Sequence, residues 1–146
     1  IRVVGYGHST TVPYTLTVTA SDNPDSSEPE NNERDNAVEL TSGVARQGYI
    51  ATVDDADWYK VSAYSGQSVR VEASLPQNDD IGLKVEIYEP YNTSYFWRDY
   101  DYDALTAPIY FDSGQQLIIS DGIYYIRVVG YGHSTTVPYT LTVTVN

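Results

Sequence analysis

Acidic and amide side chains gather in two parts of this sequence, and their oxygens are ligands that suit a hard cation. The first part precedes a run of predicted strands and holds Glu28, Glu30, Asn31 and Asn32. The second part is an acidic turn between two predicted strands, with Asp54, Asp55 and Asp57. Ca²⁺ takes about six to eight oxygen ligands from such groups. The two parts therefore predict a calcium site, with a solvated acidic linker and an acidic turn as the alternative.

Aromatic side chains crowd into residues 88–102, and polar residues accompany them. The segment contains Tyr88, Tyr91, Tyr95, Phe96, Trp97, Tyr100 and Tyr102, together with Asn92, Arg98 and Asp99. Sugar rings stack their apolar C–H faces on Tyr or Trp, while Asn, Asp and Arg satisfy the hydroxyls. An exposed aromatic strip would bind a glycan or a protein neighbour. The candidate ligand-binding residues are Tyr91, Tyr95, Trp97, Arg98, Tyr100 and Tyr102.

The alternative for this segment is an ordinary strand with one face in the core. Alternation would then place Tyr95 and Trp97 on one side, and Phe96 and Arg98 on the other. A second cation site is conceivable at Asp99, Asp101 and Asp103, which alternate with tyrosines. Repulsion between the three carboxylates favours a solvent-exposed strand face instead. The spacing of the three residues also does not match an EF-hand loop.

Composition excludes several classes of protein. The two histidines, His8 and His133, are copies of one turn residue, and no nucleophile elbow or zinc-binding helix motif occurs. There is no Cys, which excludes disulfides and thiol catalysis. The formal charge of −12 argues against nucleic acid and anionic membranes as partners. No apolar run is long enough for membrane insertion. We therefore expect no enzymatic activity.

Short alternating runs, broken by turn residues, must position these side chains. They span 48–53, 58–64, 67–75, 83–88, 124–129 and 139–145, and only Glu33 to Leu40 suits a helical turn. A period of two gives one buried and one wet face per strand. Fifteen tyrosines and many Val and Thr also favour strands. The sequence predicts an all-β fold, an antiparallel jelly-roll-like β-sandwich of about eight or nine strands.

An identical repeat divides the chain. Residues 1–19 read IRVVGYGHSTTVPYTLTVT, and residues 126–144 read the same. We interpret 1–20 as the last hairpin of a preceding identical repeat, 21–36 as an acidic linker and 37–146 as the β-sandwich module. An engineered duplication is the alternative.

The order EPENNERDNAVEL, GYIATVDDADWYKV and GIYYIRVVGYGHSTTVPYTLTV resembles the bacterial pre-peptidase C-terminal (PPC) domain, which is related to the collagen-binding domains of clostridial collagenases. The resemblance covers about 110 residues, from Glu28 to the end, and the segment from Tyr88 to Gln116 departs from it. It implies a non-catalytic extracellular module that binds polysaccharide or protein. It also places calcium ligands at Asp54, Asp57, Asn31 and Asn32, with Glu28 or Glu30 replacing the family's glutamate, whose position holds Pro29.

The sequence is compatible with two functions. The first is a structural or adhesive repeat of a bacterial or archaeal secreted or cell-surface protein, in which the 1–19 segment pairs with, or is exchanged into, neighbouring copies to form a filament. The second is a carbohydrate- or matrix-binding accessory module of a secreted hydrolase. The repeat favours the first function, and the aromatic segment favours the second.

Overall fold

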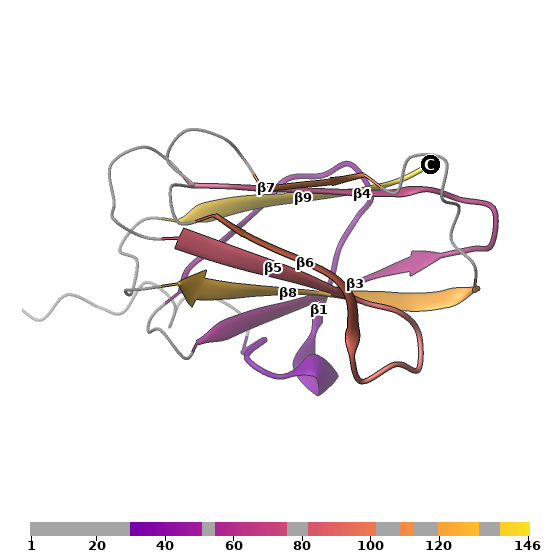
Figure 1. Ribbon diagram of the computed structural model, residues 1–146, viewed down its shortest axis with the longest axis horizontal. Coiled ribbons are helices and arrows are strands. Elements are labelled where there is room, and N and C mark those ends of the chain that lie inside the picture. Colours follow the sequence, from indigo (N-terminus) through magenta and orange to yellow (C-terminus); the bar gives the residue numbers. More distant parts are fainter. Residues whose placement is uncertain (1–29, 51–54, 76–81, 102–108, 113–119, 132–137) are drawn as a thin grey trace, which may run out of the picture.

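The computed structural model describes residues 30–50, 55–75, 82–101, 109–112, 120–131 and 138–146, which form a sandwich of two β-sheets (Figure 1). The strands span Val38–Glu39 (β1), Arg46–Gly48 (β2), Ala56–Ala63 (β3), Val69–Ser74 (β4), Gly82–Tyr88 (β5), Tyr95–Asp101 (β6), Ile109–Asp112 (β7), Gly122–Tyr131 (β8) and Tyr139–Val145 (β9). The five-stranded sheet has the order β1-β3-β8-β5-β6, and the four-stranded sheet has the order β2-β9-β4-β7. The predicted all-β sandwich is confirmed, and within it β1 and β3 form a parallel pair.

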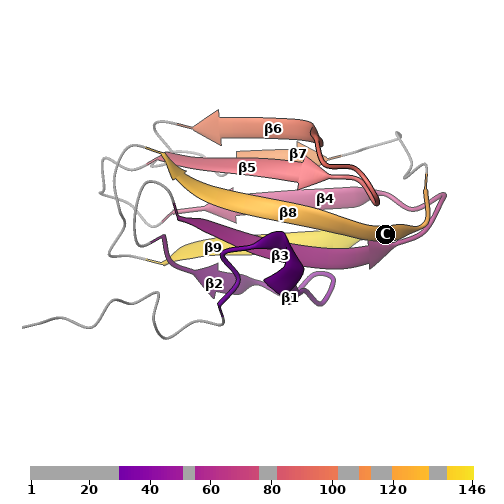
Figure 2. The ribbon, with the colours of Figure 1, turned by 90° about the horizontal axis from the view of Figure 1, so that it is seen from below.

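The core lies between the two sheets and follows the predicted alternation. On β4, Val69, Val71 and Ala73 are buried, and Arg70 between them is exposed. On β9, Tyr139, Leu141 and Val143 are buried in the same way. Figure 2 shows the five-stranded sheet in front of the four-stranded one. Each inner face is apolar because side chains alternate strictly along a strand.

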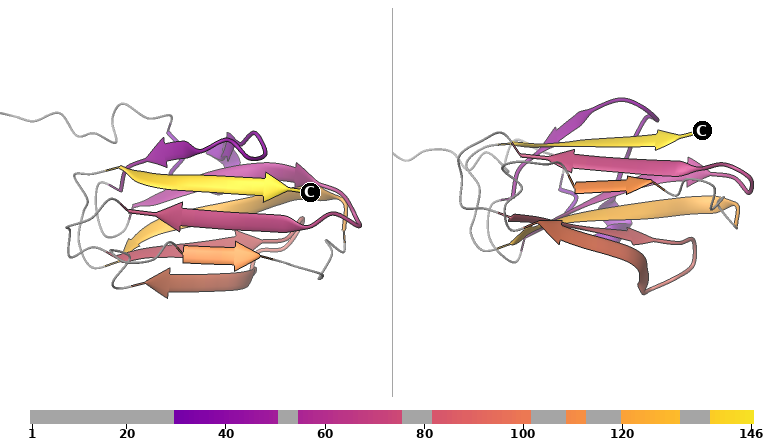
Figure 3. Two further views of the ribbon diagram at one scale, coloured as in Figure 1. Left: turned by 90° about the horizontal axis from the view of Figure 1, so that it is seen from above. Right: turned by 45° about the horizontal axis from the view of Figure 1, so that its top comes forward.

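The repeated segment 126–144 does not fold as a hairpin. Its first part belongs to β8, which lies between β3 and β5 in the five-stranded sheet. Its second part belongs to β9, which lies between β2 and β4 in the four-stranded sheet (Figure 3, left). The expected hairpin is therefore wrong for this segment, because its two strands lie in different sheets and each is an interior strand.

Four described strands do not match the predicted runs. β1 is only two residues long, and β6 and β7 lie in the aromatic segment and beyond it, where apolar and polar residues do not alternate simply. The run predicted from Gly48 begins where β2 ends, since β2 is Arg46–Gly48. The predicted helical turn is present as the short 3₁₀ helix η2, Arg34–Asn36.

Part of the predicted linker packs on the module. The backbone carbonyl of Asn31 accepts the Trp58 N–H at 2.7 Å, and the Asn31 amide donates to the Trp58 carbonyl at 3.4 Å. After Asn31, helix η2 lies against the five-stranded sheet on the side away from the four-stranded sheet (Figure 1). Residues 31–36 therefore fold as part of the sandwich.

Several predicted features lie outside the described residues. They include the 1–20 copy, the linker up to residue 29 and the turn containing His133. No helix in the described ranges is long and apolar enough to cross a membrane.

Candidate functional site

The outer face of the five-stranded sheet, which points away from the core, carries a continuous set of polar and aromatic side chains. We define this outer face by Trp58, Lys84, Glu86, Tyr88, Tyr125 and Arg127. The register places Trp58, Arg127 and Glu86 side by side across β3, β8 and β5. Their strand neighbours Tyr59, Ile126 and Ile87 point to the core instead.

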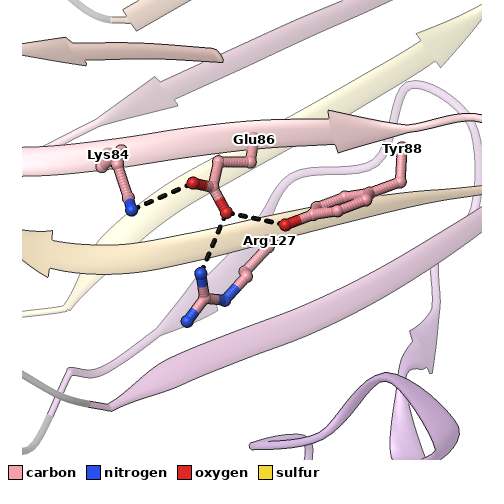
Figure 4. A network of polar contacts seen from close by, with 4 residues as sticks. All are labelled: Lys84, Glu86, Tyr88 and Arg127. Atoms are coloured by element: carbon pink, nitrogen blue, oxygen red, sulfur yellow. Dashed lines mark hydrogen bonds and ion pairs between the residues drawn. The ribbon is translucent and has the colours of Figure 1, made fainter. Parts of the chain in front are cut away.

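Glu86 is the centre of a polar network on this outer face (Figure 4). Its carboxylate lies 3.0 Å from Lys84 Nζ and 3.0 Å from Arg127 Nη1, and it accepts a 2.9 Å hydrogen bond from the Tyr88 hydroxyl. Glu86 is only 3% exposed. The wet face expected for β5 is therefore wrong at Glu86 and Tyr88, because neighbouring side chains cover both.

The electrostatics of the network follow from this burial. Burial raises the pKa of Glu86, but the hydrogen bonds from Lys84, Arg127 and Tyr88 outweigh it, so its pKa lies below the ordinary value. Burial, together with the Glu86 carboxylate, raises the pKa of Tyr88 to about 12. The network therefore holds an ionised carboxylate and a neutral phenol at neutral pH.

Aromatic rings pack around the network. Trp58 and Tyr88 have ring centroids 5.1 Å apart, and the Arg127 guanidinium lies 5.6 Å from the Trp58 ring. The Arg34 guanidinium of η2 lies 4.1 Å from the Tyr125 ring and 5.7 Å from the Tyr88 ring. These distances are in the range of cation–π contacts. Helix η2 is thus fixed on the outer face by one arginine.

A pocket of about 440 Å³ opens beside η2. Its walls are Arg34 and Asp35 of η2, Pro90 and Tyr91 of the turn after β5, and Gly122, Ile123 and Tyr125 of β8. Arg34 Nη1 donates a 2.6 Å hydrogen bond to the Asn92 carbonyl, which ties η2 to the turn. No single segment of the chain predicts this pocket, because its walls come from three distant segments.

A β-bulge changes the faces expected for the aromatic segment. Tyr95 pairs with Tyr88, while Trp97 pairs with Ile87, so one residue of β6, Phe96, is extra. Tyr95 therefore contacts Tyr88 on the outer side, at a centroid distance of 6.2 Å, whereas Trp97 packs against the core. The expectation that Tyr95 and Trp97 share a face is wrong for this reason.

The other predicted ligand residues are partly described. Tyr91 is 97% exposed and has a left-handed backbone, with φ of 62°. Arg98 and Tyr100 lie on β6, opposite Glu86 and Lys84 in register. Tyr102 lies outside the described residues, as does Asp103.

Asp57 is buried in the core at the start of β3. Tyr139 donates a 2.5 Å hydrogen bond to its carboxylate, and the Tyr139 and Tyr59 hydroxyls are 2.6 Å apart. Burial, with Tyr59 and Asp57 nearby, raises the pKa of Tyr139 well above its usual value. Gly48 permits this packing, because a Cβ there would lie 2.2 Å from the Tyr139 hydroxyl.

The predicted calcium ligands fall partly within the described residues. Asn31 and Asp57 are both buried, at 1% and 0% exposure, and Asn31 is bonded to Trp58, the residue after Asp57. Glu30 and Asn32 are exposed, whereas Glu28 and Asp54 lie outside the described residues. Buried amide and carboxylate oxygens fit a hard cation. Among the described residues alone, no group of three or more His, Cys, Asp or Glu side chains is placed to hold a metal.

The chain resembles known proteins in its structure. No protein-family model matches the sequence, and a search of curated proteins finds no significant relative. Among solved structures, the chain is similar to the pre-peptidase C-terminal domain of a collagenase from Bacillus anthracis, with 16% identity and a TM-score of 0.51, covering 74% of this chain and 94% of that one. It is also similar to PliG of Aeromonas hydrophila, a periplasmic inhibitor of g-type lysozyme, with 17% identity and a TM-score of 0.53, covering 75% and 96%.

At these identities the similarity describes architecture. The expected resemblance is confirmed at that level: residues that the structure describes adopt the β-sandwich fold of the pre-peptidase C-terminal domain.

Proposed function

We propose that this chain is a non-catalytic structural and adhesive repeat module of a secreted or cell-surface protein, able to assemble by exchanging its repeated segment. The observation that carries the proposal is the identity of residues 1–19 and 126–144. The second copy supplies residues 126–131 of β8 and 139–144 of β9, which are interior strands of the two sheets. A module without such a segment lacks the middle of both sheets.

One sandwich has one place for this segment, and the chain contains two copies. The first copy can complete a preceding module in a tandem array, or it can enter the sandwich of another chain in place of 126–144. Exchange of identical elements between chains is a known route to oligomers, and donation from chain to chain in one direction produces a filament. The proposed assembly therefore needs no new interface.

The first copy also contains the residues that make the polar contacts of the second copy. Arg2 corresponds to Arg127, which binds the buried carboxylate of Glu86 at 3.0 Å. Tyr14 corresponds to Tyr139, whose hydroxyl is bonded in the core. Either copy thus carries an arginine that can pair with Glu86 and a tyrosine that can donate to Asp57.

We further propose that calcium stabilises the start of the module. Asn31 and Asp57 would contribute oxygens, with Glu28, Glu30, Asn32 and Asp54 as the remaining candidates. The support is the burial of Asn31 and Asp57 at the point where the linker joins β3. Bound calcium would supply charge neutralisation for these oxygens.

The exchange can be tested with two variants of identical composition. Glu86→Arg with Arg127→Glu restores the ion pair for the second copy, so we expect a monomer by light scattering. Glu86→Arg with Arg2→Glu restores it only for the first copy, so we expect larger, concentration-dependent species. A version lacking residues 1–20 should be monomeric. Equal masses for the two charge-exchanged variants would contradict the exchange.

A carbohydrate- or matrix-binding module is the second candidate. It is favoured by exposed aromatic side chains near the turn after β5, namely Tyr91, Tyr95 and Phe96. Tyr91→Ala is the informative substitution, because Trp97 packs against the core and its removal would also lower stability. Loss of glycan or matrix binding in Tyr91→Ala would support this candidate.

A further inference from the structure

The pocket beside η2 combines apolar surfaces with two charged groups of opposite sign. Tyr125, Ile123 and Pro90 provide ring and aliphatic surfaces, and Arg34 and Asp35 provide a guanidinium and a carboxylate. An apolar ligand would remove water from both charges without replacing their hydrogen bonds, which is unfavourable. A ligand for this pocket therefore needs both an apolar face and groups that hydrogen-bond to the two charges.

The pocket is held in shape by contacts that require no ligand. Arg34 is fixed by its 2.6 Å hydrogen bond to the Asn92 carbonyl and by its 4.1 Å approach to the Tyr125 ring. Gly122 has φ of 148°, and a Cβ there would lie 2.8 Å from carbon atoms of Pro90. The absence of a side chain at Gly122 lets β8 approach the turn closely. A preformed site of this kind loses little entropy on binding.

Tyr91 stands at the rim of the pocket with almost all of its side chain in solvent. A bulky residue in the left-handed region is uncommon and costs free energy. Burial of the Tyr91 ring does not compensate for this cost, because the side chain is 97% exposed. A ring held outward beside a pocket is placed to stack on a ligand that enters it.

We propose that this pocket binds a neutral sugar, as a mono- or disaccharide unit of a larger glycan. The sugar ring stacks against Tyr91, and Arg34 and Asp35 hydrogen-bond its hydroxyls. The volume of about 440 Å³ lies in the usual range for small-ligand sites. The protein's charge of −12, and Asp35 within the pocket, disfavour acidic glycans. This inference rests on the second candidate function and gives it a site and a ligand class.

The test is calorimetric titration of the full chain with neutral oligosaccharides of two to four units: cello-, malto-, manno- and chito-oligosaccharides. Oligogalacturonate and a proline-rich peptide serve as comparison ligands. We expect one neutral series to bind with Kd of about 0.01–1 mM, at least tenfold weaker in Tyr91→Ala and about fivefold weaker in Arg34→Lys. Tyr64→Ala, which removes another exposed tyrosine, is the matched control and should bind as the unmodified chain does.

Three outcomes would overturn the proposal, once thermal melting shows that the variants are folded. Neutral-sugar binding that is insensitive to both Tyr91→Ala and Arg34→Lys would place the sugar site elsewhere and leave the second candidate function intact. Tighter binding of oligogalacturonate or the peptide would overturn the ligand class. No binding of any of these ligands would overturn both the site and the second candidate, while the masses of the charge-exchanged variants would still report on assembly.

Discussion

The Tyr139 hydroxyl donates a 2.5 Å hydrogen bond to the carboxylate of Asp57. This bond joins β9 of the four-stranded sheet to the start of β3 in the five-stranded sheet. Both residues are fully buried. We expect Tyr139→Phe to lower the free energy of unfolding by about 1–3 kcal/mol, because it removes a donor from a buried carboxylate. Chemical denaturation measures this change.

The chain carries its own control for this substitution. Tyr14 has the same sequence surroundings as Tyr139. In a monomer whose own second copy forms β9, Tyr14→Phe should leave the free energy of unfolding unchanged. Equal destabilisation by the two substitutions would mean that both copies occupy a sandwich, and no effect of Tyr139→Phe would contradict the importance of the bond.

Gly48→Ala should be strongly destabilising. Its Cβ would lie 2.2 Å from the Tyr139 hydroxyl and 2.7 Å from the Tyr59 hydroxyl, so two buried rings must move. Forcing a methyl group into a packed core costs about 1–3 kcal/mol, and thermal melting should detect it. Val44→Ala, at an exposed position on the preceding loop, should be nearly neutral. A melting temperature for Gly48→Ala equal to that of the unmodified chain would contradict the close packing.

The Glu86 network should make stability depend on pH. The folded-state pKa of Glu86 is lowered, so its ion pairs stabilise the fold above its ordinary pKa of about 4.5 and are lost as the pH falls below it. At pH 7, Glu86→Gln should cost about 1–3 kcal/mol, and the difference from the unmodified chain should shrink by pH 3. Denaturation at both pH values measures it.

A surface pair provides the comparison. Arg70 and Glu72 lie 3.7 Å apart and are both substantially exposed. Glu72→Gln should change stability by less than about 0.5 kcal/mol at either pH. If Glu86→Gln costs the same at pH 3 and pH 7, the ionised carboxylate is not what stabilises this face.

The calcium proposal predicts a rise in melting temperature on addition of Ca²⁺. A ligand that binds only the folded state stabilises it by about 2.7 kcal/mol at 100 times its Kd. Asp54→Asn should remove this rise, and Asp35→Asn, at an exposed position in η2, should retain it. Asp57→Asn is less informative, because Asp57 also accepts the Tyr139 bond. No response of the unmodified chain to calcium would contradict the proposal.

The alternation of apolar and polar residues predicted the strands that have one solvent-exposed and one buried face. Val69, Val71 and Ala73 on β4 illustrate this, because each outward neighbour is polar. The same alternation predicted an exposed Glu86 on β5, but Glu86 is buried by the side chains of Lys84 and Arg127. Alternation reports which face a residue is on, and it does not report what covers that face. Large aromatic residues at outward-facing positions, namely Trp58, Tyr88 and Tyr125, are the feature of the sequence that indicates a covered face.

The remaining differences arise from contacts between distant segments. The extra residue at Phe96 has no local signature, yet it reverses the face of Tyr95 relative to Trp97. The turn residues between β8 and β9 in the sequence would equally suit a hairpin, and only the pairing partners of the two strands show that they belong to different sheets. The pocket depends on η2 docking beside β8, which no single segment encodes.

The attachment points at the two ends of the module have a mechanical consequence. Asn31 is bonded to Trp58 at the start of β3, and Asn146 is bonded to Ser68, beyond the end of β3. In a tandem array, tension would therefore run along the strands and load β9 lengthwise against β2 and β4. Ladder hydrogen bonds lie across the strands, so this force shears many of them together instead of opening them one after another. Such a module would resist pulling as a load-bearing link.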